Sequence, residues 1–213
     1  MADRKRIDDC LSTQDGHLFI EKFDCVTLIQ EFGSPLFVLS EDQIRRCVEA
    51  GVRITIDSLE EVDMIARAAQ ESGRTATVRL RLKPTLSGFI DRTDFNASGL
   101  VPTDIAAMVY KGGLTFEQIM TVAPRILEMD NVELVGFHEH HGRHHRSTRY
   151  WEQQMTAFAK EVGRVCKALG GYHPKEIDIG GGFATPRDPF NAVTDYTEPL
   201  QLGALFTISR AIK

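Results

Sequence analysis

The sequence contains no long apolar segment and few cysteines. Its longest apolar run, residues 105–110, has six residues, far fewer than the ~20 needed to span a bilayer. The charged opening MADRKRIDD has no apolar stretch behind it, so it does not resemble a secretory signal. None of the four cysteines has the C-x-x-C spacing of a zinc or redox motif, and we expect buried free thiols. These absences predict a cytoplasmic protein with no membrane partner.

Basic residues are also fewer than acidic ones, 25 against 30. The net charge is -5 and the isoelectric point is near 5.8, whereas a nucleic-acid-binding protein normally carries a basic face. Hydrophobic residues make up 42% and charged residues 26% of the 213 positions, which is ordinary for a globular protein. We therefore expect no nucleic-acid partner and one large domain or two small ones.

Short β-like runs alternate with longer helical ones, a pattern typical of an α/β fold with a mainly parallel sheet. Strands are predicted at residues 36–39, 53–57, 77–82, 132–138 and 176–179. Helices are predicted at residues 24–32, 41–48, 59–72, 104–110, 116–129 and 147–169, with an interruption or restart at Pro124. Residues 84–102, rich in Gly, Ser, Thr and Asp, are predicted to form a long loop.

A run of three glycines follows the last predicted strand. Residues 178–183 read DIGGGF, so Gly180, Gly181 and Gly182 come where strand-to-helix loops of α/β folds bind ligands. Glycines allow positive φ and bring backbone N–H groups close to an anion. Phosphate is the anion that we expect to bind there. A turn without any ligand is the alternative.

A histidine cluster follows the preceding strand. Residues 136–145 read GFHEHHGRHH and contain five of the seven histidines. On a strand, His138 and His140 would share one face, with Glu139 and His141 on the other. Paired imidazoles and a carboxylate could hold Zn²⁺; alternatively one imidazole packs on a cofactor ring, or the segment is a polar loop without a ligand.

These segments together resemble the fold-type III pyridoxal-phosphate decarboxylases, the group of diaminopimelate, ornithine and arginine decarboxylases. Residues 28–40 (LIQEFGSPLFVLS) are similar to the family's opening, and residues 49–51 (EAG) and 56–61 (IDSLEE) to its E-A-G and V-D-S segments. Residues 79–84 (RLRLKP), 136–142 and 178–183 are similar to its L-R-[VI]-N-P, G-x-H-x-H-x-G and D-[IVL]-G-G-G-F motifs. The matches span about residues 24 to 190 in the family's order, and diaminopimelate decarboxylase is the nearest subtype.

The resemblance implies a site for pyridoxal 5'-phosphate and no metal. Gly180, Gly181 and Gly182 would bind the cofactor phosphate through their backbone amides. His140 would stack on the pyridine ring, Arg81 would lie near the cofactor, and His138 would lie behind the residues that touch it. Arg143 stands where the family commonly has a Ser that helps to hold the phosphate, and its guanidinium could reach the same group.

The resemblance also implies segments that this sequence does not contain. The family's first barrel strand carries the lysine that holds the cofactor covalently, and here the predicted helix at residues 41–48 runs directly into residues 49–51. We therefore expect an incomplete TIM-type, alanine racemase-like (β/α)₈ barrel of about four parallel strands with flanking helices, without the C-terminal β-domain. The expected units are residues 1–50 (helix-strand-helix), 51–190 (partial cofactor-binding barrel) and 191–213 (irregular tail). No lysine matches the family's Schiff-base lysine, and Lys83 is the one candidate near the cofactor.

The expected function is that of a pyridoxal-phosphate-dependent decarboxylase, a carboxy-lyase acting on a basic or dibasic amino acid such as diaminopimelate. Turnover is expected to be impaired because the lysine segment is missing. A homodimer or pairing with a fuller-length relative is expected, since sites of this family lie at dimer interfaces. Two alternatives stay open: a non-catalytic relative that binds the cofactor or a partner, and a metal-dependent hydrolase that uses His138, His140 and a carboxylate.

Overall fold

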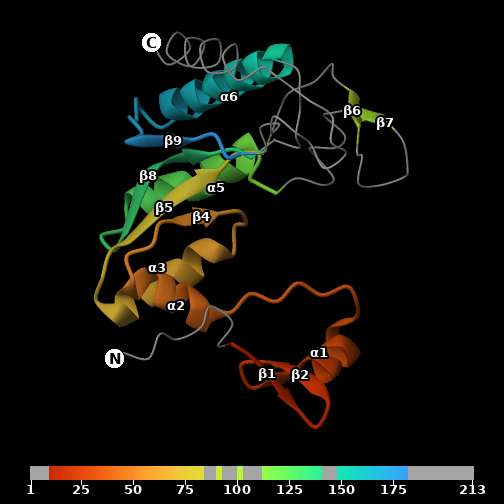
Figure 1. Ribbon diagram of the computed structural model, residues 1–213. Coiled ribbons are helices and arrows are strands. Elements are labelled where there is room, and N and C mark those ends of the chain that lie inside the picture. The colour runs from red at the N-terminus through yellow and green to blue at the C-terminus, as the bar shows by residue number, and fades with distance from the viewer. Residues whose placement is uncertain (1–9, 84–89, 93–99, 103–111, 141–147, 182–213) are drawn as a thin grey trace, which may run out of the picture.

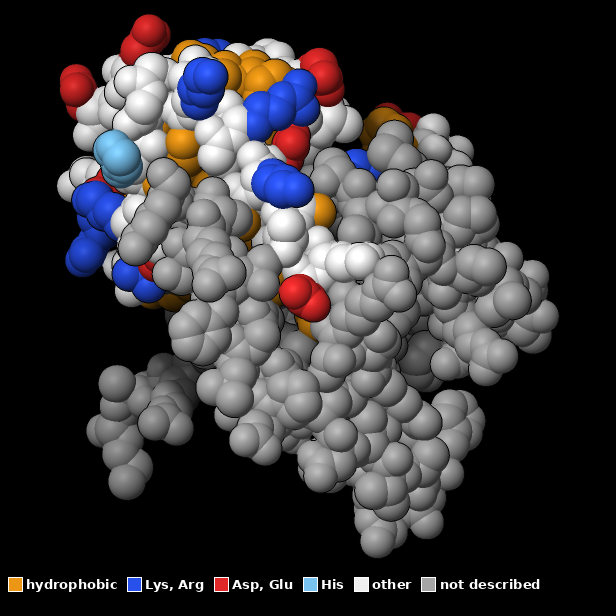
Figure 2. Space-filling model, turned by 90° about the horizontal axis from the view of Figure 1, so that it is seen from above, with side chains coloured by type: hydrophobic (Ala, Val, Ile, Leu, Met, Phe, Trp, Pro, Cys, Tyr) orange, Lys and Arg blue, Asp and Glu red, His pale blue; other side chains and the backbone are white. Residues whose placement is uncertain are grey.

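The computed structural model describes residues 10–83, 90–92, 100–102, 112–140 and 148–181 (Figure 1). The predicted helix at residues 104–110 and the predicted tail at residues 191–213 lie outside these ranges. Among the described helices, none is long and apolar enough to cross a membrane. Seen from above, the coloured surface carries basic and acidic side chains interspersed with apolar ones (Figure 2).

A four-stranded parallel sheet forms the centre of the structure. Its strands are β4 (Ile54–Ile56), β5 (Ala76–Arg81), β8 (Val132–His138) and β9 (Glu176–Asp178), in the order β4-β5-β8-β9. Each pairs in parallel with the next, as consecutive strands of a βα-barrel do. The prediction of about four parallel strands is confirmed.

Four helices flank the sheet: α2 (Glu41–Glu49), α3 (Glu61–Ser72), α5 (Phe116–Leu127) and α6 (Thr148–Ala168). Figure 1 shows α5 behind the sheet, α6 beyond β9, and α3 with α2 beyond β4. The Ser40 hydroxyl caps α2 by accepting the Gln43 N–H at 3.1 Å, and Gly73 ends α3 with φ +62°. The helix boundaries therefore follow local capping chemistry.

Helix α5 departs from the prediction of an interruption at Pro124. It begins with a capping box between Thr115 and Gln118 and runs through Pro124 without a break. Proline removes one helical hydrogen bond, but Val122, Ala123 and Ile126 around it are 0% exposed. Burial of this apolar face holds the helix together across the proline.

The two faces of the sheet differ in their side chains. In β5, Ala76, Val78 and Leu80 are buried, whereas the alternate residues are only partly buried. The buried residues belong to the same apolar core as the inward faces of α3, α5 and α6. We call this the outer face, and the opposite one the inner face. In β8 a register shift skips Val135, which is buried like Leu134 but lines a pocket on the inner face.

The N-terminal part differs from its prediction. Strands β1 (Leu11–Gln14), β2 (His17–Ile20) and β3 (Phe23–Asp24) form an unpredicted antiparallel sheet, followed by the predicted helix α1 (Cys25–Phe32). The β1–β2 turn is Asp15-Gly16, both at positive φ, a hairpin signal that can be read from sequence. The strand predicted at residues 36–39 is wrong, because this segment pairs with no strand in the described part of the chain.

Two further predictions need correction. The segment at residues 84–102 contains the antiparallel pair β6 (Ile90–Arg92) and β7 (Leu100–Pro102), so it is not only a loop. The four cysteines are free thiols, but all are partly exposed rather than buried. Cys25 lies in α1, which buries no residue, and this explains its exposure. Partial burial raises the pKa of the Cys166 thiol.

Candidate functional site

Four polar side chains stand in a row across the carboxyl ends of the parallel strands. Arg81, His138 and Asp178 are aligned by the registers of β5, β8 and β9, and Asp57 directly follows β4. We call these four residues the carboxyl-end row. Arg81 Nη1 donates to Asp57 Oδ2 at 2.5 Å, which joins the first two members. The row places two acids, a guanidinium and an imidazole on one edge of the sheet.

Several polar atoms of this row are buried but have no hydrogen-bond partner among the described residues: Nε of Arg81, Oδ1 of Asp57 and Nδ1 of His138. Buried polar atoms of native proteins are rarely left without partners. Burial lowers the pKa of the His138 imidazole, and the nearby Arg81 and Arg79 lower it further, while Asp178 partly opposes them. The row therefore offers an uncharged imidazole and donors and acceptors that a polar ligand can satisfy.

The glycine run closes directly onto the histidines. Gly180 has φ +67°, and its N–H donates to Asp178 Oδ1 at 2.8 Å. The Gly181 N–H donates to His140 Nδ1 at 3.1 Å, so in this arrangement Nδ1 carries no proton. A Cβ at Gly180 would lie 2.6 Å from His140 Nδ1 and 2.7 Å from the Glu139 carbonyl. Only glycine fits at this position.

The two histidines share one face, as strand alternation predicts. The rings of His138 and His140 are nearly parallel at 12°, with centroids 6.4 Å apart. Glu139 lies on the other side, where it is buried and accepts a 2.5 Å hydrogen bond from Gln154 of α6. Within the described ranges, no group of three or more His, Cys, Asp or Glu side chains could hold a metal ion.

The structure brings together most of the predicted site residues. Arg81, His138, His140, Gly180 and Gly181 all lie at the carboxyl ends of β5, β8 and β9. Gly182 and Arg143 lie outside the described residues. Lys83 comes two residues after β5 and is partly buried, and its backbone N–H donates to the Leu114 carbonyl at 2.9 Å.

Sequence reasoning missed the partners of these residues. Asp57 was read only as part of a motif, although its place after a strand and before a predicted helix is itself a site signal. Arg79 contacts Asp178, which is 99 positions away in the chain. No local pattern reports a contact over that separation.

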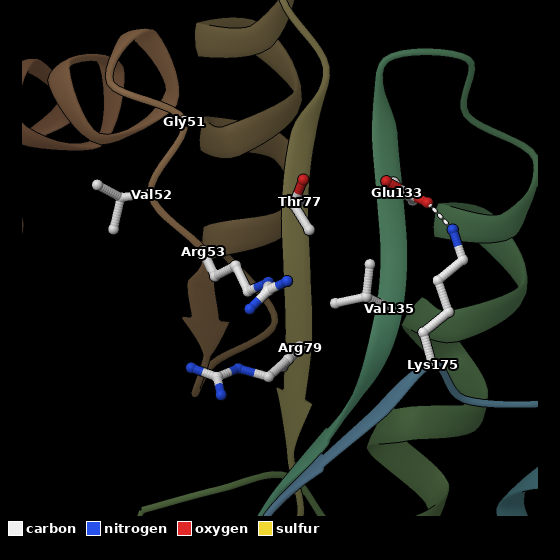
Figure 3. Close-up of a pocket in the computed structure, with 8 residues that line it drawn as sticks. All are labelled: Gly51, Val52, Arg53, Thr77, Arg79, Glu133, Val135 and Lys175. Carbon is white, nitrogen blue, oxygen red and sulfur yellow. Dashed lines mark hydrogen bonds and ion pairs between the residues drawn. The ribbon is translucent and has the colours of Figure 1, made fainter.

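A pocket of about 680 Å³ opens on the inner face near the amino ends of the strands (Figure 3). Arg79 of β5 and Arg53, which directly precedes β4, extend into it, and Lys175 pairs with Glu133 on its other side. Arg53 also pairs with Glu176 at 3.1 Å. These charges are paired within the chain, but Nε of Arg79 and Oε1 of Glu176, like atoms of the carboxyl-end row, are buried without a hydrogen bond among the described residues.

Comparison with known proteins identifies the relatives of the chain. Residues 38–203 match the family described as "Pyridoxal-dependent decarboxylase, pyridoxal binding domain". Over 145 residues the chain is 28% identical to diaminopimelate decarboxylase from Pseudomonas aeruginosa, covering 67% of this chain and 32% of that protein. It is 34% identical over 80 residues to the Methanocaldococcus jannaschii enzyme, covering 36% and 18%. The chain thus spans at most about a third of the length of these curated relatives.

Solved structures show the same fold. Diaminopimelate decarboxylase from M. jannaschii in complex with L-lysine matches with a TM-score of 0.60 at 18% identity, over 95% of this chain and 63% of that one. The Helicobacter pylori enzyme with L-lysine gives a TM-score of 0.62 at 18% identity, over 80% and 40%. The four described strands therefore form an incomplete α/β barrel of this type. The chain belongs to the pyridoxal-dependent decarboxylase family, whose cofactor is the pyridoxal phosphate that the sequence predicts.

Proposed function

We propose that this chain supplies the cofactor site of a carboxy-lyase that acts on a basic or dibasic amino acid such as diaminopimelate. The observation that carries the proposal is the set of buried, unpartnered atoms on Arg81, His138 and Asp57, next to a turn where a Cβ would strike His140. A polar, planar ligand at this edge would satisfy those atoms. The diaminopimelate decarboxylases among the relatives support the substrate class.

The residues that would hold pyridoxal phosphate are those at the carboxyl ends of β5, β8 and β9. The His140 ring presents a flat face, and Arg81 and His138 offer polar atoms beside it. The amides of Gly180 and Gly181 already donate to Asp178 and His140, so a phosphate would share these donors or depend on Gly182 and Arg143. When bound, the cofactor withdraws electrons from the substrate carbon that loses its carboxyl group.

The residues of this chain would hold a proton, place a positive charge at the site and exclude water from the strands that carry it. The lowered pKa of His138 keeps its imidazole neutral, so that Nδ1 can accept or hold a proton at the site. Arg81 is fixed by Asp57 and brings a permanent positive charge to the same edge. The sheet and helices exclude water from the outer face of these strands.

We further propose that the chain by itself binds the cofactor reversibly and turns over substrate poorly. Lys83 is the one lysine near the carboxyl ends among the described residues, and it follows β5 at a position where the family's strand motif has Asn. The described residues of this site therefore offer no covalent attachment point comparable to the family's lysine. Lysine also shuttles protons in such reactions, so its loss affects more than cofactor retention.

Titration of the purified chain with pyridoxal phosphate, followed by absorbance and fluorescence, tests the site. We expect saturable binding that weakens about tenfold or more in His140→Ala, because a ring-stacking contact and a turn contact are both lost. His173→Ala, a histidine in the segment between α6 and β9, is the matched control and should bind as the wild type does. Absence of saturable binding contradicts the proposed site.

Borohydride reduction of the same mixture, followed by peptide mass spectrometry and an assay of decarboxylation, tests whether covalent attachment and turnover are impaired. We expect no lysine to be labelled stoichiometrically and no measurable decarboxylation. Stoichiometric labelling of Lys83, abolished in Lys83→Met, would contradict the proposal that the site lacks an attachment point and would identify Lys83 as that point.

A second candidate is a non-catalytic protein that pairs with a copy of itself or with a fuller-length relative. It is favoured by the two sheet edges that β4 and β9 present among the described strands, and by exposed aromatic residues such as Phe37 and Phe32, 98% and 63% exposed. Size-exclusion chromatography with light scattering, alone and with a full-length relative, separates the candidates. A monomer that captures no relative counts against this one.

A further inference from the structure

The glycine turn is held by a carboxylate that is itself held from two strands away. Asp178 uses Oδ1 to accept the Gly180 N–H and uses Oδ2 to bind the Arg79 guanidinium. Both oxygens of the carboxylate are therefore committed, one to the turn and one to a side chain of β5. A carboxylate bound on both oxygens has little freedom to rotate about its own axis.

The contact between Arg79 and Asp178 spans β8 at Gly136, a residue without a side chain. The sheet register aligns Arg79 with Gly136 and Gly136 with Glu176. β8 lies between β5 and β9, and the residue of β8 in this register is a glycine. A Cβ at Gly136 would lie only 1.9 Å from the Glu176 carbonyl oxygen. The arginine thus crosses the strand at a position without a side chain.

Other contacts of Arg79 fix its guanidinium at the same place. Its Nε lies 3.6 Å from Glu176 Oε1, and its side chain is only 19% exposed. Figure 3 shows Arg79 and Arg53 extending over the same part of the inner face. Arg53 reaches Glu176 at 3.1 Å but is 60% exposed. The two arginines belong to one group of ion pairs, and Arg79 is the one that connects it to the turn through Asp178.

We infer that Arg79 is the positioning residue of the glycine turn: it holds Asp178 across Gly136, and Asp178 in turn holds Gly180 against His140. This inference rests on the proposed cofactor site for its consequence, because a preset turn is what an anion-binding loop needs. Arg79 acts on the turn through Asp178.

Amide hydrogen exchange of the ¹⁵N-labelled chain, measured without cofactor, tests the positioning role directly. Relative to the core amides of β8, we expect Arg79→Met to exchange about tenfold faster at Gly180 and Gly181 because a charge-assisted contact is lost. Arg53→Met is the matched control and should leave both glycines unchanged. Arg79→Lys, which keeps the charge, should restore part of the protection. In the Asp178→Ala background, Arg79→Met should add nothing further.

Cofactor titration of the same variants gives the second readout. We expect affinity for pyridoxal phosphate to fall about tenfold in Arg79→Met and to stay unchanged in Arg53→Met, since the same charge-assisted contact is lost only in the first. Wild-type exchange at Gly180 in Arg79→Met overturns the inference, and so does equal acceleration in Arg53→Met or in the β8 core. If the wild type binds no cofactor but the exchange pattern is as expected, the proposed function fails while the positioning role stands.

Discussion

The two faces of the parallel sheet are stabilised in different ways. The outer face of β5 and β8 buries Val78, Leu80 and Phe137 with no exposure at all. The inner face carries charged side chains, whose ion pairs run from Arg53 through Glu176 and Arg79 to Asp178. Apolar burial depends on area and little on direction, whereas each ion pair needs a particular register. The outer face therefore determines whether the chain folds, and the inner face determines how the candidate site is shaped.

The largest expected effect lies on the outer face. Phe137 is fully buried and meets Tyr172 edge to face, with ring centroids 6.1 Å apart. Phe137→Ala removes this packing and leaves a cavity, which we expect to cost about 3–5 kcal/mol of unfolding free energy in urea. Phe37→Ala, at a phenylalanine that is 98% exposed, is the control and should change little. A loss below about 1.5 kcal/mol for Phe137→Ala would contradict the difference between the faces.

The next largest effect is expected at Gly136, the β8 residue without a side chain. Gly136→Ala puts a Cβ 1.9 Å from a backbone carbonyl of β9, so that the strands must move apart. We expect a cost of about 1–3 kcal/mol or more, together with loss of the β8–β9 pairing in amide exchange. Gly163→Ala in α6 has open space around it and should stabilise slightly, because alanine is the better helix former. An unchanged unfolding free energy in Gly136→Ala would show that β8 tolerates a side chain at this position.

The same difference explains what the sequence could predict. Strand β8 was predicted with its observed bounds, because alternating and continuous apolar residues report burial locally. Helices α2 and α3 were also predicted close to their observed bounds, since Ser40 before α2 and Gly73 after α3 act on their immediate neighbours. The contact between Arg79 and Asp178 was not predicted. It depends on the register shift that aligns Arg79 with Gly136 instead of Val135. One skipped residue in a distant strand determines that contact, and no window of sequence contains it.

Titration of His138 sharpens the comparison, since this imidazole is the inner-face group whose pKa is lowered. Burial keeps the folded pKa below the ordinary 6.5, so the unfolded chain binds more protons as pH falls from about 6.5 to the folded value. Stability should therefore be constant above that window and fall within it. We expect the urea midpoint to drop as the pH falls below about 6.5, and the part of this drop due to His138 to vanish in His138→Gln. An unchanged pH profile in that variant would contradict the assignment.

The smallest effect is expected where the inner face is most open to water. Lys175 pairs with Glu133, and the two side chains are 68% and 42% exposed. Water and salt screen such pairs, so Lys175→Met should change the unfolding free energy by no more than about 1 kcal/mol. A double-mutant cycle with Glu133→Gln gives the coupling between the two, which should shrink further when salt is added. A coupling well above that size would mean that this end of the inner face is less open to water than the exposed fractions of the two side chains indicate.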